Sequence, residues 1–296
     1  MPNETATLQL DRTLGDYWTL TKPEVNFLIL IATSAGFYMG SPESSHAFPF
    51  MRLLHTLIGT LLVASGTGTL NQYVEREFDA LMRRTRNRPL PAGRMEPSAA
   101  LWFGTLISIA GAVYLAALVN PLASLLAVFT LASYLFVYTP LKRKTPLCTY
   151  VGAFPGAMPV LIGWAGASGN AGPEAWGLYA LLFLWQFPHF MAIAWIYRHD
   201  YARAGYFVLP EGEQSAYLMS STTVATSAAL IPLTIGLARA SHAGLALTLG
   251  SVMVSFGYFF FSLRLALEPS TIRARRLLAA SIFYLPIALL LAVLGK

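Results

Sequence analysis

Charged residues are scarce in this chain. Only 11% of its 296 residues are Asp, Glu, Lys or Arg, whereas a soluble domain carries about 25%. The single cysteine, Cys148, excludes an internal disulfide and any metal site built from cysteines. The first 23 residues are too polar to contain the apolar core of a secretory signal. We therefore expect neither a soluble domain, nor a disulfide-stabilised scaffold, nor a cleaved leader.

Long apolar segments dominate the chain instead. A run of about 18 or more apolar residues predicts a membrane span. Backbone groups in lipid must be bonded within their own segment, which favours helices. Nine such runs occur, at residues 24–40, 53–75, 99–118, 122–139, 148–167, 176–197, 221–238, 243–263 and 276–294. We predict an all-α polytopic membrane protein, with 1–23 as a cytoplasmic N-terminal segment and 24–296 as one nine-helix domain.

Positive charges lie almost entirely on one of the two sides that nine spans define. The N-terminal segment and the joints at 76–98, 141–147, 198–220 and 264–276 hold 17 of the 20 Lys and Arg residues. Because such residues are retained on the cytoplasmic side, we predict a cytoplasmic N-terminus. The same rule accounts for the net charge of +6, so we expect no nucleic acid as a partner.

The second apolar run ends in NQYVEREFD, residues 71–79. If the helix continues to about residue 80, then Asn71, Glu75 and Asp79 recur every four residues and form one polar row. Arg76 and Glu77 lie elsewhere around such a helix. A row of oxygen ligands suits Mg²⁺, which takes one or two carboxylates together with phosphate oxygens. The simpler alternative is a solvated acidic helix end before a positive loop.

Basic residues follow this row directly and recur at a second joint. Guanidinium groups match phosphate oxygens in geometry and charge. The loop after the row contains Arg83, Arg84, Arg86, Arg88 and Arg94. The segment YTPLKRKTP adds Tyr138, Lys142 and Arg143 on the same side. These three residues either close over a departing diphosphate or only mark the cytoplasmic side.

The sixth run reads WQFPHFMAIAWIYRHDYARAGYFVLP and ends with Arg198 and Asp200 on that side as well. Two helices thus deliver acids to one membrane face, as a metal–diphosphate site needs. His189 precedes Asp200 by eleven residues, so it lies about 16 Å deeper on nearly the same helix face. It is expected to form an interhelical hydrogen bond or to contact a substrate at mid-membrane depth.

Four segments resemble the intramembrane aromatic (UbiA-type) prenyltransferase superfamily, in particular its haem-modifying branch. They are NQYVEREFDALMRRTRNRPLPAGR, YTPLKRKTP, VGAFPGAMPVLIGWAG and HFMAIAWIYRHDYARAGYFVLP, and the resemblance spans residues 15–295. The first motif of the superfamily is N-x-x-x-D-x-x-x-D, and Glu75 stands at its middle position, as in the haem branch. The second motif pairs two aspartates four apart, but Ala204 follows Asp200 at that spacing, which weakens the second metal site.

The resemblance implies a nine-helix bundle around a central cavity open to the cytoplasmic leaflet of the bacterial inner membrane. It implies farnesyl diphosphate and haem B as substrates, Mg²⁺ as cofactor, and haem A synthase or terminal oxidase assembly factors as candidate partners. The implied metal ligands are Asn71, Glu75, Asp79 and Asp200, which together with Lys142 and Arg143 form the catalytic set. Arg83, Arg84, Arg88, Tyr138 and Arg198 are then expected on the diphosphate, and His189 on haem.

Three other functions fit part of the pattern. A prenyltransferase for a quinone or chlorophyll precursor is the nearest, although Glu75 and the missing second aspartate argue against it. A secondary transporter would place its acids near the bilayer midplane, whereas these acids lie at one face beside an arginine-rich loop. A haem-binding membrane protein without activity would bind haem independently of any metal.

Overall fold

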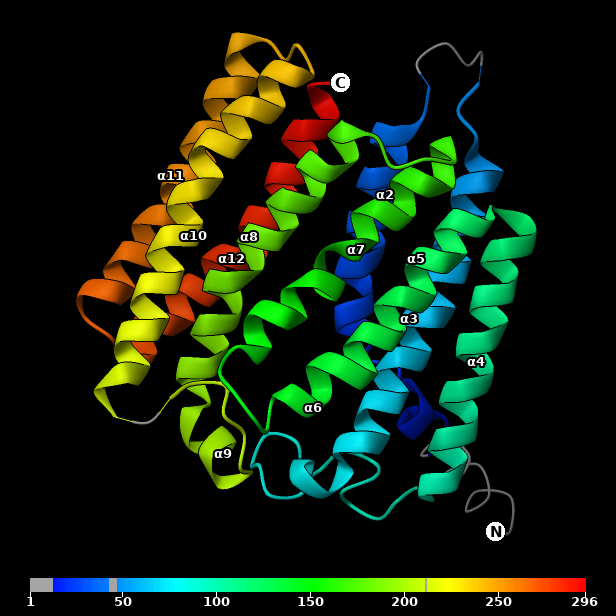
Figure 1. Ribbon diagram of the computed structural model, residues 1–296, viewed down its shortest axis with the longest axis vertical. Helices are drawn as coiled ribbons and strands as arrows, with labels where there is room; N and C mark the ends of the chain where they lie inside the picture. The colour runs from blue at the N-terminus through cyan, green and yellow to red at the C-terminus, as the bar shows by residue number, and fades with distance from the viewer. Residues whose placement is uncertain (1–12, 43–46, 211) are drawn as a thin grey trace, which may run out of the picture.

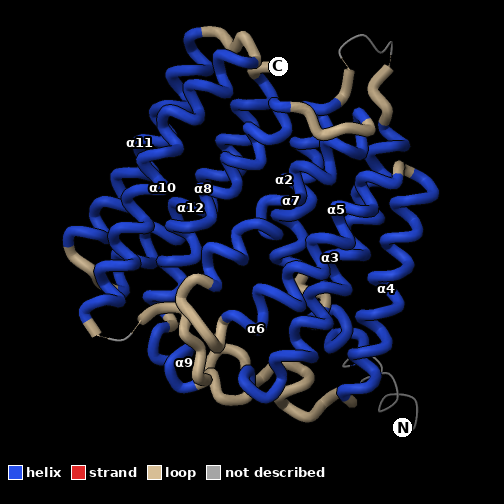
Figure 2. The backbone as a smooth tube through the Cα atoms, in the orientation of Figure 1, coloured by secondary structure: helices blue, strands red, loops and turns tan. Residues whose placement is uncertain are grey.

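Every regular element of the described chain is a helix, as Figures 1 and 2 show. The computed structural model describes residues 13–42, 47–210 and 212–296, so the first half of the predicted N-terminal segment lies outside it. Residues 13–20 are helical and are followed by α2 (Pro23–Gly40), α3 (Phe50–Asp79), α4 (Pro97–Leu118), α5 (Pro121–Ala132), the π-helix η1 (Ser133–Tyr138), α6 (Thr139–Leu141), α7 (Cys148–Ser168), α8 (Pro173–Ile196), α9 (Arg198–Arg203), α10 (Glu213–Ala240), α11 (Leu245–Leu267) and α12 (Thr271–Leu294). The predicted all-α class is confirmed for these residues.

Eight of the described helical stretches are long and apolar enough to cross a membrane, with α5, η1 and α6 counted as one. The first predicted span, α2, is not among them, so the predicted count of nine is one too high by this measure. Its first turns carry Glu24 and Asn26. Asn26 is buried and donates to the Thr21 carbonyl at 2.8 Å and to the Ser65 hydroxyl at 2.9 Å. Because α2 is only 18 residues long, these polar residues near its start weigh heavily on its mean hydropathy.

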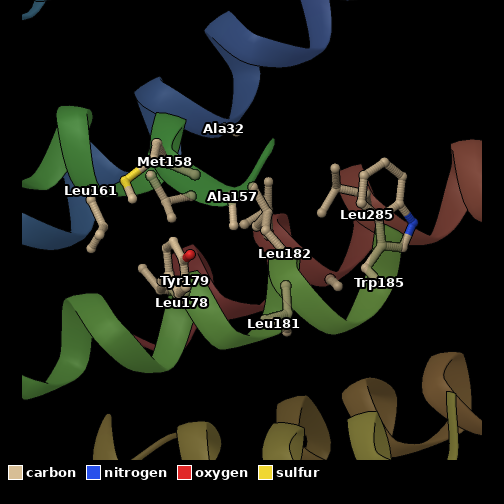
Figure 3. Packing of buried hydrophobic residues seen from close by; sticks show 14 of the residues in the cluster. Ala32, Ala157, Met158, Leu161, Leu178, Tyr179, Leu181, Leu182, Trp185 and Leu285 are labelled. Atoms are coloured by element: carbon tan, nitrogen blue, oxygen red, sulfur yellow. The ribbon is translucent and has the colours of Figure 1, made fainter. Parts of the chain in front are cut away.

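The helices pack in a ring that follows the chain from α2 round to α12, and α12 returns to α2. Within it α7 is the most enclosed, with 72% of its most apolar window buried. Figure 3 shows the core where α7 and α8 meet α2 and α12, formed by Ala32, Ala157, Met158, Leu161, Leu178, Tyr179, Leu181, Leu182, Trp185 and Leu285. Large apolar side chains on other helix faces are exposed, as lipid-facing positions require, among them Trp102, Val113, Leu125, Met253 and Phe283.

The charged connections gather at one end of the bundle, the lower end in Figure 1, and the C-terminus lies at the other. The connection after α3, the short α6 and α9 all lie there. Arg203 of α9 donates to the Leu81 carbonyl, two residues beyond α3, at 3.4 Å. The second and sixth predicted spans therefore end side by side.

Glycine lets α2 and α7 approach backbone to backbone. A Cβ atom added to Gly163 would lie 2.0 Å from the carbonyl oxygen of Thr33, and one added to Gly36 would lie 2.1 Å from that of Val160. Backbone atoms, unlike the ends of flexible side chains, cannot move aside cheaply. The seam between these two helices is therefore closed.

We predict that Gly163→Ala destabilises the protein, because its methyl group meets backbone in this seam. Overpacking of this kind costs about 1–3 kcal/mol, which lowers the melting temperature of the detergent-solubilised protein measurably. Gly257→Ala is the matched control, since nothing lies within 4 Å of a Cβ at that helical position. Equal melting temperatures for the two variants would contradict the close seam.

Candidate active site

The acid row lies on the inner face of α3, which continues to Asp79 as expected. Asn71, Glu75 and Asp79 are buried, with 1%, 6% and 1% of their surface exposed. Arg76 and Glu77 instead form an ion pair of 3.2 Å in which the Glu77 side chain is 75% exposed. The predicted separation of an inward row from outward charges is thus what α3 shows.

Both carboxylates of the row are bonded to cations from other segments. Lys142, directly after α6, donates from Nζ to Glu75 Oε1 at 2.8 Å. Arg88, in the connection between α3 and α4, donates from Nη1 to Asp79 Oδ2 at 2.7 Å. The two carboxylates are only 9% and 2% exposed as side chains. Without these partners, each buried charge would be strongly destabilising.

The residue before α2 contacts the same row. Lys22 donates from Nζ to Asn71 Oδ1 at 2.7 Å. The amide nitrogen of Asn71 in turn donates to the Thr139 hydroxyl at 3.3 Å. Asn71 therefore connects α3 to the start of α2 and to α6.

We refer to Lys22, Asn71, Glu75, Asp79, Arg88 and Lys142 as the acid–cation cluster. Burial, followed by the charge of Arg88, lowers the pKa of Lys22 to about 7. Burial also opposes the charge of Lys142, but the bonded carboxylate of Glu75 outweighs it and holds the pKa of Lys142 well above its usual range. Lys142 therefore stays charged at neutral pH, whereas Lys22 is close to its titration point.

A π-helix determines where Lys142 lies. In η1 the chain makes a wide turn. Such turns are rare in proteins, and those that occur are often found at functional sites. The Lys142 ammonium lies 4.6 Å from the centroid of the Tyr138 ring, within cation–π range. The predicted grouping of Tyr138 with Lys142 is present, and its role on a substrate stays a prediction.

Asp200 lies at the same end of the molecule but is bonded within its own helix. Its carboxylate pairs with Arg203 at 3.1 Å. The residue four positions on, Ala204, is buried with Met82 and Tyr206 in a small apolar cluster. Among the described residues, no three His, Cys, Asp or Glu side chains are close enough to hold a metal ion. A preformed cage of carboxylates around Asp200 is therefore absent from this part of the chain.

The cluster nevertheless matches what a hard divalent cation requires. Glu75, Asp79 and the amide oxygen of Asn71 present oxygen atoms along one helix face. Mg²⁺ typically takes one or two carboxylates and completes its shell with water and phosphate oxygens, rather than with a full protein cage. The neighbouring cations supply donors for those phosphates.

The other predicted basic residues have three kinds of surroundings. Arg84 reaches α9, where its guanidinium lies 4.9 Å from the Tyr197 ring centroid and donates to the Tyr201 hydroxyl at 3.4 Å. Arg94 instead pairs with Asp16 at 2.9 Å, which ties down the N-terminal helix. The remaining side chains keep to the periphery: Arg83 and Arg86 are exposed, Arg143 covers the Phe78 ring, and Arg198 donates to the Trp195 carbonyl.

His189 bonds across to α12, as one of its two interpretations predicts. Its Nδ1 lies 2.7 Å from the Ser281 hydroxyl oxygen, and its ring stacks on Trp185 at 5.1 Å. The Ser281 hydroxyl hydrogen is already donated to the Leu278 carbonyl at 2.6 Å. With that hydrogen donated to Leu278, Nδ1 acts as the donor to Ser281 and Nε2 keeps its lone pair.

Sequence reasoning missed the contribution of the segment before α2. Lys22 was counted only as a positive charge on the cytoplasmic side, and Gln72 was not considered. Gln72 is buried and donates to the carbonyls of Thr19 and Leu20 at 3.1 and 3.0 Å. The sequence feature that indicates this contact is the lysine immediately before Pro23, because that position is the start of a helix.

A helical bundle with a buried acid row at one end is the arrangement expected of an intramembrane prenyltransferase. The model of the UbiA prenyltransferase family matches residues 29–293, so the chain belongs to this family and is an integral multi-pass membrane protein. It is 46% identical to a protoheme IX farnesyltransferase of Solibacter usitatus, over 96% of this chain and 99% of that protein.

Solved structures show the same fold at low identity. A structure of digeranylgeranylglyceryl phosphate synthase superposes with a TM-score of 0.74 at 18% identity, covering 96% of this chain and 98% of the other. A UbiA homologue of Archaeoglobus fulgidus bound to GPP and Mg²⁺ gives 0.61 at 15% identity, covering 91% and 99%.

Removing one partner of the Glu75–Lys142 pair should cost more stability than removing both. We predict that Lys142→Met lowers the unfolding free energy by about 3–5 kcal/mol, because Glu75 is left buried and unpaired. The double variant Glu75→Leu, Lys142→Met should recover much of this loss in thermal unfolding.

The exposed pair supplies the control for this experiment. Glu77→Ala removes a surface ion pair, which is worth about 0–1 kcal/mol. The structure would be wrong about the buried pair if Lys142→Met unfolded at the same temperature as Glu77→Ala.

Proposed function

We propose that this protein transfers the farnesyl group of farnesyl diphosphate to a vinyl group of haem B. Water adds in the same reaction and gives hydroxyethylfarnesyl haem, the haem O used by terminal oxidases. The proposal rests chiefly on the near full-length similarity to a protoheme IX farnesyltransferase. The acid–cation cluster supports it, because it combines metal ligands with phosphate donors at one end of the bundle.

Asn71, Glu75 and Asp79 are the residues we assign to a divalent cation, with Asp200 of α9 as a fourth ligand. The homologue of Archaeoglobus fulgidus bound to GPP and Mg²⁺ supports a cation of this kind. When bound, it supplies positive charge to the diphosphate. Each acid of the cluster already has a cationic partner, so Lys142 and Arg88 would exchange for a bound metal at the carboxylates and would then be left to the phosphates.

The basic residues stabilise the leaving diphosphate. Lys142 and Arg88 are the two cations released by that exchange, and Lys22 adds a third at the same place. We assign Arg83, Arg84, Arg143, Arg198 and Tyr138 to the surrounding diphosphate shell. Groups fixed in advance around a developing charge lower the barrier because they need not reorganise.

The reaction needs no nucleophilic side chain. As the carbon–oxygen bond to the diphosphate breaks, an allylic cation develops on the farnesyl group, and a haem vinyl carbon attacks it. The new cation beside the porphyrin ring takes up water and loses one proton. Haem B, farnesyl diphosphate and water thus give the modified haem, diphosphate and a proton.

His189 is the residue we assign to haem. Its Nε2 lone pair is available because Nδ1 donates to Ser281, and haem iron commonly takes a histidine nitrogen. The ring is held by the Trp185 stack within α8 and by the Ser281 bond to α12, so it can contact a substrate without reorienting.

In the cell we assign the protein to the bacterial inner membrane, with its N-terminus and the acid–cation cluster on the cytoplasmic side. This orientation follows from the side on which Lys and Arg are concentrated. Haem A synthase and terminal oxidase assembly factors are the partners that the product would require.

The first test is mass spectrometry of haem extracted after incubation with farnesyl diphosphate and Mg²⁺. We expect haem whose mass has increased by one farnesyl group and one hydroxyl group, together with released diphosphate. Diphosphate release that does not depend on haem would instead favour another acceptor. Absence of diphosphate chemistry would favour the transporter.

Substitutions in the row should rank by position. Asp79→Ala and Asn71→Ala should abolish turnover, and Glu75→Gln should nearly abolish it, because each removes an oxygen ligand from the inner face. Glu77→Ala is the control and should have a mild effect, since its side chain is 75% exposed. If Glu77→Ala were as inactive as Asp79→Ala, the assignment of the functional face of α3 to the acid row would be wrong.

Haem titration tests the role of His189. We expect His189→Ala to weaken haem binding and to change the absorption spectrum of bound haem, because the iron loses a nitrogen ligand. Ser281→Ala removes the hydrogen-bond partner but keeps the ring, so it should shift the spectrum less. Unchanged affinity and spectrum in His189→Ala would remove this residue from the haem site.

A further inference from the structure

Tyr206, which follows α9, is held beside the acid–cation cluster from several directions. Its ring lies 5.9 Å from that of Phe78 and 6.1 Å from that of Tyr201, measured between centroids. The next residue, Phe207, donates its backbone N–H to the Lys142 carbonyl at 2.7 Å. The side chain is therefore fixed between the end of α3 and the residue that bonds to Glu75.

The hydroxyl of Tyr206 forms no hydrogen bond of good geometry, although the residue is only 6% exposed; the acceptor toward which it is directed is the Glu75 carboxylate, which is already bonded to Lys142. Other buried tyrosines of this protein do form such a bond. The Tyr258 hydroxyl donates to the Trp185 carbonyl at 2.9 Å, and that of Tyr179 donates to the Phe154 carbonyl at 3.2 Å. A buried hydroxyl without a partner is costly, and phenylalanine would fill the same space without that cost.

The unpartnered hydroxyl faces the cluster. The charges that act on it are those of Glu75, Lys142 and Asp79. A tyrosine hydroxyl carries one O–H and ionises only at about pH 10, so it is a neutral donor at physiological pH. A neutral phenol suits an anionic oxygen acceptor better than it suits a metal ion.

We propose that Tyr206 is a substrate-binding residue, whose hydroxyl donates a hydrogen bond to a phosphate oxygen of the prenyl diphosphate bound at the acid–cation cluster. This inference rests on the proposed function, because it needs a diphosphate at that place. It gives the loop after α9 a direct role, although the aspartate expected at position 204 is missing there.

The test compares unliganded stability with diphosphate binding in Tyr206→Phe, which keeps the ring and removes only the oxygen. We expect the melting temperature of the unliganded protein to stay the same or rise. We expect affinity for farnesyl diphosphate with Mg²⁺, measured by calorimetry without haem, to fall about tenfold to hundredfold, as for a lost hydrogen bond to a charged group.

Two further variants calibrate these readouts. Tyr258→Phe removes a hydroxyl that has a protein partner and should lower the unliganded melting temperature. Tyr217→Phe changes a residue that is 77% exposed and should alter neither quantity.

Each outcome is decisive. If Tyr206→Phe binds farnesyl diphosphate as tightly as the unmodified protein does, this inference is wrong and the proposed function is unaffected. A loss of unliganded stability equal to that of Tyr258→Phe would also overturn it, because the hydroxyl would then serve the fold. If the unmodified protein binds no farnesyl diphosphate, the proposed function fails and this inference fails with it.

Discussion

The pairing of two buried carboxylates with cations from outside α3 is the interaction on which this structure depends. Glu75 and Asp79 are buried near the C-terminal end of α3, where a charge without a partner would be strongly destabilising. Lys142 arrives from the fourth apolar run and Arg88 from the loop after α3, so neutralising the acids also assembles those segments. Stability of the bundle end and readiness for an anionic ligand thus arise from the same contacts.

The convergence of these segments on Glu75 and Asp79 depends on backbone features as much as on charge. The π-helix adds a residue to one turn, and in a regular α-helix each residue turns the following ones by about 100°. Without that turn, Lys142 would point away from Glu75. The loop after α9 is similarly tied by the bond from Phe207 to the Lys142 carbonyl. Several segments of the chain are in this way positioned around one lysine.

Periodicity and charge were sufficient to predict the all-α class, most helix positions and the inward face of α3. A spacing of four residues fixes which side chains share a helix face, so Asn71, Glu75 and Asp79 could be found without coordinates. Neighbours of this row such as Lys22 and Tyr206 could not be found in this way, because the spacing of residues within a helix does not say which loop folds onto which helix end. The span count is one too high because α2 has only 18 residues, and two of its first four are polar.

The closed seam between α2 and α7 restricts how a hydrophobic substrate moves. Where a single added methyl group would collide with backbone at Gly36 or Gly163, a chain of isoprene units has no passage. A prenyl tail that reaches the cluster sideways from the bilayer must therefore enter elsewhere than between α2 and α7 at the level of Gly36 and Gly163.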